Sequence, residues 1–161
     1  MILRREMRVR KVVISKVPFN EAASIQLTSA QQNVYYIEDT RVDSGSGEVY
    51  SLLNETGSIP DAGFVVLNNI PVTAEGRGMF EERFQNRAGL VEKEPGFKAI
   101  RILRPETSDT YIVMTVWESK DYFKKWQESN AYNHAHKKRG TKEGLGSSIF
   151  PRPSYVTEYT I

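Results

Sequence analysis

The chain has 161 residues, of which 39% are hydrophobic and 26% charged, a balance typical of a globular protein of one or two small domains. Its 22 basic and 20 acidic residues give a net charge of +2, which excludes a strongly basic nucleic-acid-binding surface over the whole chain. No apolar run is long enough to cross a membrane, and the absence of cysteine excludes disulfides, thiolate metal sites and thiol nucleophiles. We therefore expect a cytoplasmic protein that binds neither nucleic acid nor a membrane.

The first sixty residues contain four short segments that are rich in β-branched and aromatic side chains, a composition that favours strands. The segments are Lys11–Val17, Ser24–Thr28, Asn33–Glu38 and Glu48–Leu53. The sequence Thr56–Gly63, with two glycines and a proline, predicts a linker or a tight crossing. These patterns predict a β-rich half-domain over residues 1–60, followed by a second domain over residues 61–161.

The second part of the chain alternates strand and helix patterns. Strands are predicted over Phe64–Ile70, Phe97–Leu103, Thr110–Trp117 and Ser154–Ile161. A helix over Thr73–Leu90 carries the apolar stripe Phe80, Phe84, Ala88 and Val91. After the third strand, Ser119 and Ser129 each cap a helix, the second ending at Gly140. The order β-α-β-β-α-β predicts a ferredoxin-like α+β domain, with the β-rich N-terminal half packed on its sheet.

The chain has two histidines, His134 and His136, both in the last predicted helix. Residues two apart on a helix lie about 200° apart, so the two imidazoles cannot face one site together. His136 falls on the less polar stripe with Tyr132 and Ala135, which directs it inward and His134 toward water. Two interpretations of His136 stay open: a hydrogen-bonded core histidine, or an axial ligand of a haem iron.

An asparagine pair and two tryptophans are the other candidates. Asn68 and Asn69 interrupt an apolar strand whose alternation puts Asn68 on the face of Phe64, Val66 and Ile70, and Asn69 on the face of Val65 and Leu67. A buried amide needs hydrogen-bond partners or costs about 1–3 kcal/mol. One of the two is either a strand-end amide bonded to a loop or a donor aimed at a ligand. Trp126 fits core packing, or one wall of a cleft shared with His136 if the helix breaks near Ser129. Trp117, which ends a strand, fits the core.

Six motifs resemble those of the IsdG-type haem-degrading monooxygenases, members of the antibiotic biosynthesis monooxygenase-like group, and they follow one another in the order and at the spacing of that family. The motifs are Leu67–Asn69, Glu82–Phe84, Thr115–Lys120, Phe123–Trp126, Ala135–Lys137 and Ile149–Tyr155. The last of these, with the β-rich N-terminal half, is similar to the two-part HmoB branch. The family fold is a dimeric α+β barrel, in which two ferredoxin-like sheets pack face to face.

This resemblance implies roles for individual residues. It implies that His136 ligates the haem iron, that Asn68 rather than Asn69 donates a hydrogen bond on the opposite side of the haem, and that Trp126 presses on the porphyrin and distorts it. Arg83 and Arg87 on the first helix are candidates for binding the haem propionates. The implied activity is opening of the porphyrin ring and release of iron, with O2 and electrons from a reductase or a small reductant.

Three other functions remain as alternatives. The chain could be a cofactor-free monooxygenase of the same group acting on an aromatic substrate, a non-catalytic haem-binding protein, or a structural interaction module. For assembly, the four N-terminal β-segments provide enough strand to replace a partner's sheet. We therefore expect a monomer that mimics the family dimer and holds one haem, because the N-terminal half has neither histidine nor tryptophan.

Overall fold

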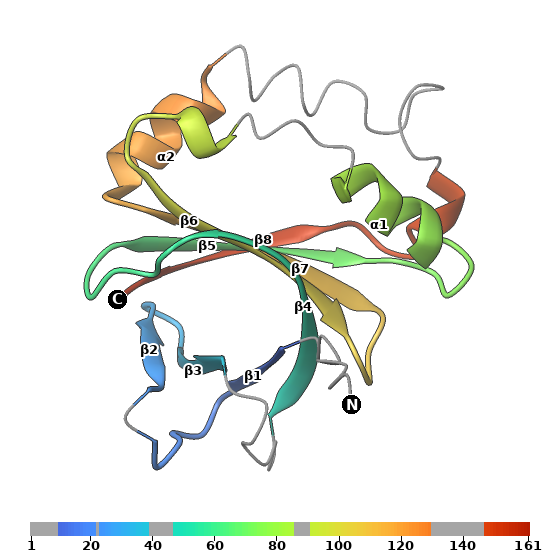
Figure 1. The fold of residues 1–161 in the computed structure, drawn as a ribbon, viewed down its shortest axis with the longest axis horizontal. Helices are drawn as coiled ribbons and strands as arrows, with labels where there is room; N and C mark the ends of the chain where they lie inside the picture. Colours follow the sequence, from blue (N-terminus) through green and yellow to red (C-terminus); the bar gives the residue numbers. More distant parts are fainter. Residues whose placement is uncertain (1–9, 22, 39–46, 86–90, 130–146) are drawn as a thin grey trace, which may run out of the picture.

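The structure is a computed structural model that describes residues 10–21, 23–38, 47–85, 91–129 and 147–161 (Figure 1). His134, His136 and Arg87 lie outside these residues, as does most of the predicted helix that begins at Ser129. The described strands are β1 (Lys11–Ser15), β2 (Ile25–Thr28), β3 (Asn33–Glu38), β4 (Glu48–Gly57), β5 (Phe64–Pro71), β6 (Phe97–Pro105), β7 (Thr110–Trp117) and β8 (Tyr155–Thr160). The described helices are α1 (Arg77–Gln85), α2 (Lys120–Gln127) and the 3-10 turns η1 (Val91–Lys93) and η2 (Ser147–Ile149).

The strands form a closed antiparallel barrel in the order β1-β3-β2-β8-β5-β7-β6-β4. The part β8-β5-β7-β6, with α1 after β5 and α2 after β7, has the strand order of a ferredoxin-like unit. This confirms the predicted ferredoxin-like α+β class. Figure 1 shows α1 and α2 over one face of this sheet, at its two ends, and β1, β2 and β3 on the opposite side.

The two faces of β5 enter two different cores because side chains alternate along a strand. Val65 and Leu67 face the barrel interior, where they pack with residues of the N-terminal strands such as Val12 and Tyr36. Phe64, Val66 and Ile70 instead pack beneath the helices, as the alternation in the sequence predicts. Asn68 has the same parity as this second set and therefore lies on the helix-covered face.

The N-terminal strands join both edges of the C-terminal sheet. On one edge, β4 pairs with β6 from Tyr50 to Gly57. On the other, β2 meets β8 through Thr28 and Thr160. Inside the barrel, the buried Arg101 of β6 donates from Nε to Glu38 Oε1 of β3 at 2.8 Å. This ion pair links the two parts of the chain across the barrel.

Several element boundaries differ from the sequence-based prediction. β4 continues to Gly57 instead of ending at Leu53, because its polar end pairs with β6. The helix predicted from Thr73 begins at Arg77, since the Thr73 backbone N–H is bonded to Ile149 O at 2.8 Å and Thr73 opens a turn. Ser119 stands at the N-cap of α2, but its side chain makes no capping hydrogen bond. Within the described ranges, no helix is long and apolar enough to span a membrane.

Candidate functional site

Asn68 places a polar group in the middle of the helix-covered face. It pairs with Val113 of β7 and Val156 of β8, and along β5 it lies between the apolar Val66 and Ile70. Its Oδ1 atom is buried and has no hydrogen-bond partner among the described residues. An unsatisfied buried amide oxygen costs about 1–3 kcal/mol, which makes Asn68 a candidate for contact with a ligand. A ligand seated on this face would lie close to the Asn68 amide.

Asn69 differs from Asn68 in both position and bonding. It points to the other face of β5 and is only 8% exposed. Its Nδ2 donates to Leu67 O at 3.1 Å, to Tyr155 O at 3.3 Å and to Thr157 Oγ1 at 3.4 Å. Asn69 therefore has a structural role: it ties β5 to β8. Of the pair, only Asn68 is placed to serve a ligand beneath the helices.

The indole of Trp126 lies at the α2 end of the same face. Helix α2 packs on the sheet through Phe123, whose ring lies 5.8 Å from that of Phe64. The half-buried Trp126 ring lies 5.4 Å from the ring of Trp117 at an interplanar angle of 31°. Trp117 ends β7 and is fully buried, as its predicted core position requires. A ligand on the Asn68 face would thus be bounded at one end by an aromatic stack.

A charged cluster fixes α1 at the other end of the face. Glu81 of α1 accepts hydrogen bonds from Arg104 Nε at 3.0 and 3.1 Å and from the hydroxyl of the buried Tyr111. Burial raises the pKa of Glu81, but the hydrogen bonds from Arg104 and Tyr111 outweigh it and leave that pKa below its usual range. Burial of the Tyr111 hydroxyl and its hydrogen bond to Glu81 raise the pKa of Tyr111 far above its ordinary value.

Arg83 stands in the last turn of this anchored helix and is half-buried. The structure thus brings three of the sequence-predicted site residues to one side of the sheet: Asn68 on β5, Trp126 on α2 and Arg83 on α1. The sequence analysis missed the cluster of Glu81, Arg104 and Tyr111. The strand predicted over Phe97–Leu103 ends before Arg104, whereas β6 includes it, and nothing local indicated its partner on α1.

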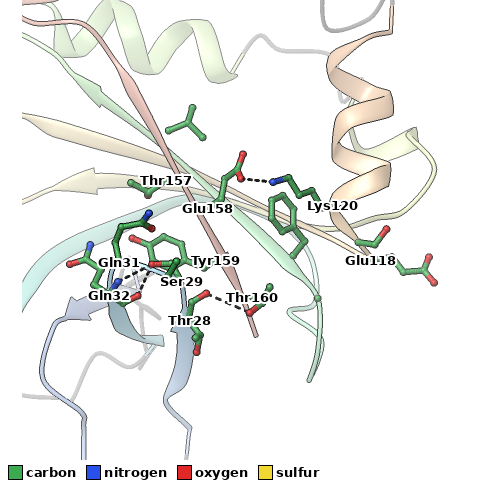
Figure 2. Close-up of a pocket in the computed structure, with 15 residues that line it drawn as sticks. Thr28, Ser29, Gln31, Gln32, Glu118, Lys120, Thr157, Glu158, Tyr159 and Thr160 are labelled. Atoms are coloured by element: carbon green, nitrogen blue, oxygen red, sulfur yellow. Dashed lines mark hydrogen bonds and ion pairs between the residues drawn. The ribbon is translucent and has the colours of Figure 1, made fainter.

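A second feature is a groove of about 1230 Å³ between β8 and the turn that joins β2 to β3 (Figure 2). Hydroxyl and amide side chains from that turn and from β8 line much of it. Lys120 and Glu158 form an ion pair of 3.4 Å across it, and Thr160 Oγ1 donates to Thr28 O at 3.5 Å. Neither Asn68 nor Trp126 lines this groove. Phe64 and Val156, which lie beside Asn68 on the sheet, also line the groove.

Among the described residues, the site thus consists of a ferredoxin-like sheet with an apolar, helix-covered face and one buried amide oxygen that has no hydrogen-bond partner. Residues 63–138 match the antibiotic biosynthesis monooxygenase family. A heme oxygenase (mycobilin-producing) of Mycobacterium tuberculosis is 35% identical over 86 residues, which are 53% of this chain and 82% of the relative. A heme-degrading monooxygenase of Halalkalibacterium halodurans is 37% identical over 83 residues, 49% of this chain and 71% of the relative.

Solved structures show the same similarity. The heme-degrader MhuD of Mycobacterium tuberculosis, solved with two hemes bound in its active site, is 30% identical and covers 61% of this chain and 94% of its own, with a TM-score of 0.50. The heme-degrading enzyme LmHde of Listeria monocytogenes covers 92% of this chain and 97% of its own with a TM-score of 0.68; at 19% identity it shows the fold alone. The chain belongs to the IsdG-type monooxygenases of the antibiotic biosynthesis monooxygenase family, which confirms the resemblance seen in the sequence motifs.

Proposed function

We propose that this protein is a haem-degrading monooxygenase that binds haem, opens the porphyrin ring with O2 and external electrons, and releases the iron. One observation carries the proposal: the Asn68 amide lies in the middle of an apolar sheet face, with its Oδ1 buried and without a partner among the described residues. A flat apolar ligand with a polar centre fits such a face, because its rim covers the valines while its centre meets the amide. The names of the 35% and 37% identical relatives support the same substrate.

Each site residue has a distinct task in this proposal. His136 ligates the iron through one imidazole nitrogen, and a hydrogen bond to the other nitrogen would fix its tautomer. The Asn68 amide would donate a hydrogen bond to a polar group bound to the haem and so orient that group. Arg83 and Arg87 bind the propionates, because a guanidinium pairs with a carboxylate through two parallel hydrogen bonds. When bound, haem itself supplies the site of O2 activation and the carbon atoms that are oxidised.

Trp126 acts by its shape. Its indole, from α2, packs on the buried ring of Trp117, and this contact limits its movement at one end of the apolar face. The rows of the sheet that carry Trp117 and Asn68 are four residues apart on β5, or about 13 Å along the strand. Trp126 would press on a bound porphyrin at this end of the face and distort it, while Asn68 would orient a polar group near its centre.

We also propose that the chain works as a cytoplasmic monomer with one haem site, in the domain of residues 61–161. Residues 1–60 stand in for the sheet of a second subunit, and the shared interior of Val12, Tyr36, Val65 and Leu67 supports this. Light scattering at micromolar concentration tests the proposal. A stable dimer of the full-length protein would contradict it, as would a haem titration that ends at two haems per chain.

Haemin titration followed by turnover tests the function. The protein is loaded with haemin without oxygen, and ascorbate and O2 are then added. The proposal predicts a sharp Soret band on loading and its loss on turnover. A Soret band that persists with ascorbate and O2 would indicate a haem-binding protein without the activity. No spectral change on loading would favour a cofactor-free monooxygenase, which is then assayed with polyphenolic substrates.

A further inference from the structure

We propose that Trp117 is a positioning residue for the reaction, because it sets the height and tilt of the Trp126 indole above the sheet and thereby the distortion of bound haem. This inference rests on the proposed function. It assigns to a buried side chain, which the sequence alone places in the core, control over a residue that touches the substrate. The geometry of the aromatic cluster under α2 carries it.

The orientation of the Trp117 ring is fixed from several sides. Its Nε1 donates a hydrogen bond to Thr115 Oγ1 at 3.0 Å, and both residues are buried on the same face of β7. The ring of Phe97 meets it edge-on, with centroids 6.0 Å apart and an interplanar angle of 89°. The ring of Phe123 packs against it at 5.9 Å. A ring with a bonded N–H and two aromatic neighbours has little freedom to rotate.

Trp126 lies on this fixed ring in a near-parallel arrangement, at 5.4 Å and 31°. It also contacts Phe123, the residue that anchors α2, at 6.1 Å. Phe123 is held in turn by Phe64, whose ring centre lies 5.8 Å from that of Phe123 and 5.9 Å from Lys120 Nζ, at the edge of the groove in Figure 2. Trp126 therefore cannot sink toward the sheet unless Trp117 changes.

The packing beneath Trp126 matters because the indole can bend a porphyrin only if the indole is harder to displace than the porphyrin is to bend. A smaller residue at position 117 would leave a cavity beneath Trp126, and the indole could retreat into it. The haem would then lie flatter while its binding groups stayed in place. Trp117 is thus predicted to affect distortion and turnover much more than haem affinity.

The stacked pair has a signature that does not need haem. Trp117 and Trp126 are the only two tryptophans of the 161-residue chain, so an indole–indole exciton couplet in far-ultraviolet circular dichroism comes from this pair. Trp117→Phe and Trp126→Phe are each expected to abolish the couplet in the apoprotein. Thr115→Val keeps both indoles but removes the acceptor of the Nε1 hydrogen bond, and it is expected to change the couplet's amplitude. A couplet that persists unchanged in Trp117→Phe would overturn the inference.

The second measurement uses the haem-loaded protein. Nuclear magnetic resonance shifts of the cyanide-bound ferric haem report how far the ring is bent. Trp117→Phe and Thr115→Val are expected to shift these resonances toward a flatter haem, to slow degradation between about tenfold and a hundredfold, and to change haem affinity by less than about threefold. Thr115→Val keeps the test decisive if Trp117→Phe does not fold. Wild-type shifts and rates in Thr115→Val would overturn the inference.

A control separates positioning from lost stability. Leu103 lies on the other side of the sheet, fully buried in the barrel interior. Leu103→Ala destabilises the protein without touching the aromatic cluster and is expected to keep the wild-type couplet and haem shifts. Equal loss of haem distortion in Leu103→Ala would overturn the role of Trp117. Wild-type protein that neither binds nor degrades haem would overturn the proposed function instead, while the couplet still reports the stack.

Discussion

Replacing Asn68 by leucine, which has nearly the same shape, removes a buried oxygen that has no hydrogen-bond partner among the described residues. The buried Oδ1 costs the apoprotein about 1–3 kcal/mol, and a leucine among Val66, Ile70 and Val113 adds apolar burial. We therefore expect Asn68→Leu to leave the free energy of unfolding unchanged or to raise it by up to about 2 kcal/mol. Haem degradation should fall sharply in the same variant, because the orienting amide is gone.

Asn69→Leu is the matched control, since the neighbouring residue has the same chemistry and the opposite environment. It removes three hydrogen bonds, of which two join β5 to β8 and one lies within β5. We expect a loss of about 1–3 kcal/mol of stability. The two variants should therefore move the unfolding midpoint in different directions although each exchanges the same two side chains.

Urea and thermal unfolding of the apoprotein measure both effects. For a chain of this length, each kcal/mol shifts the melting temperature by about 2–4 °C, which resolves the expected difference. Haem turnover by the two variants is then compared at a temperature where both are folded. If Asn68→Leu destabilised the apoprotein as much as Asn69→Leu, Asn68 would be a structural amide. Wild-type turnover in Asn68→Leu would remove it from the mechanism.

Three further variants test neighbouring parts of the fold and site. Gly96→Ala should destabilise the protein by about 1–3 kcal/mol, because Gly96 has φ +80° and an added Cβ would lie 2.2 Å from the Tyr122 ring of α2. Gly78→Ala is the control, since the space around its Cβ is open, and it should not destabilise the protein. Thermal unfolding compares the two variants. Glu81 has a lowered pKa in the folded state, so its contribution to stability is present above the ordinary glutamate pKa and is lost as the pH falls through the lowered value; urea unfolding of Glu81→Gln over this acid range should show a weaker pH dependence than wild type. His136→Ala should abolish the haemin-induced Soret band and His134→Ala should retain it; equal loss in both would refute the assignment.

The part of the site that the sequence predicted depends on local periodicity. The period of two along β5 placed Asn68 with Phe64 and Val66 on one face and Asn69 on the other, and the structure confirms this division. The hydrophobic spacing of α1 likewise placed Phe80 in the core. Such patterns are visible in a single sequence because each strand or helix buries one of its own faces.

The remaining features depend on contacts between distant segments, which a local pattern does not contain. The polar end of β4 becomes a strand only because β6 pairs with it. Glu81 meets Arg104 across 23 positions of sequence, and Arg101 meets Glu38 across 63. The barrel closure shows the same limit: four β-like segments predicted extra strands, but not that they would join both edges of the C-terminal sheet.

The most direct test of the central claim follows the iron and the tetrapyrrole together. Stoichiometrically haem-loaded wild-type protein is given O2, ascorbate and catalase, and ferrous iron is measured with a chelator while the pigment is analysed by mass spectrometry. Catalase removes free peroxide, so any remaining reaction belongs to the protein-bound haem. We predict one iron released for each haem lost, together with an oxygenated, ring-opened tetrapyrrole. Intact haem with no chelatable iron after the same treatment would contradict the assignment of this protein as a haem-degrading monooxygenase.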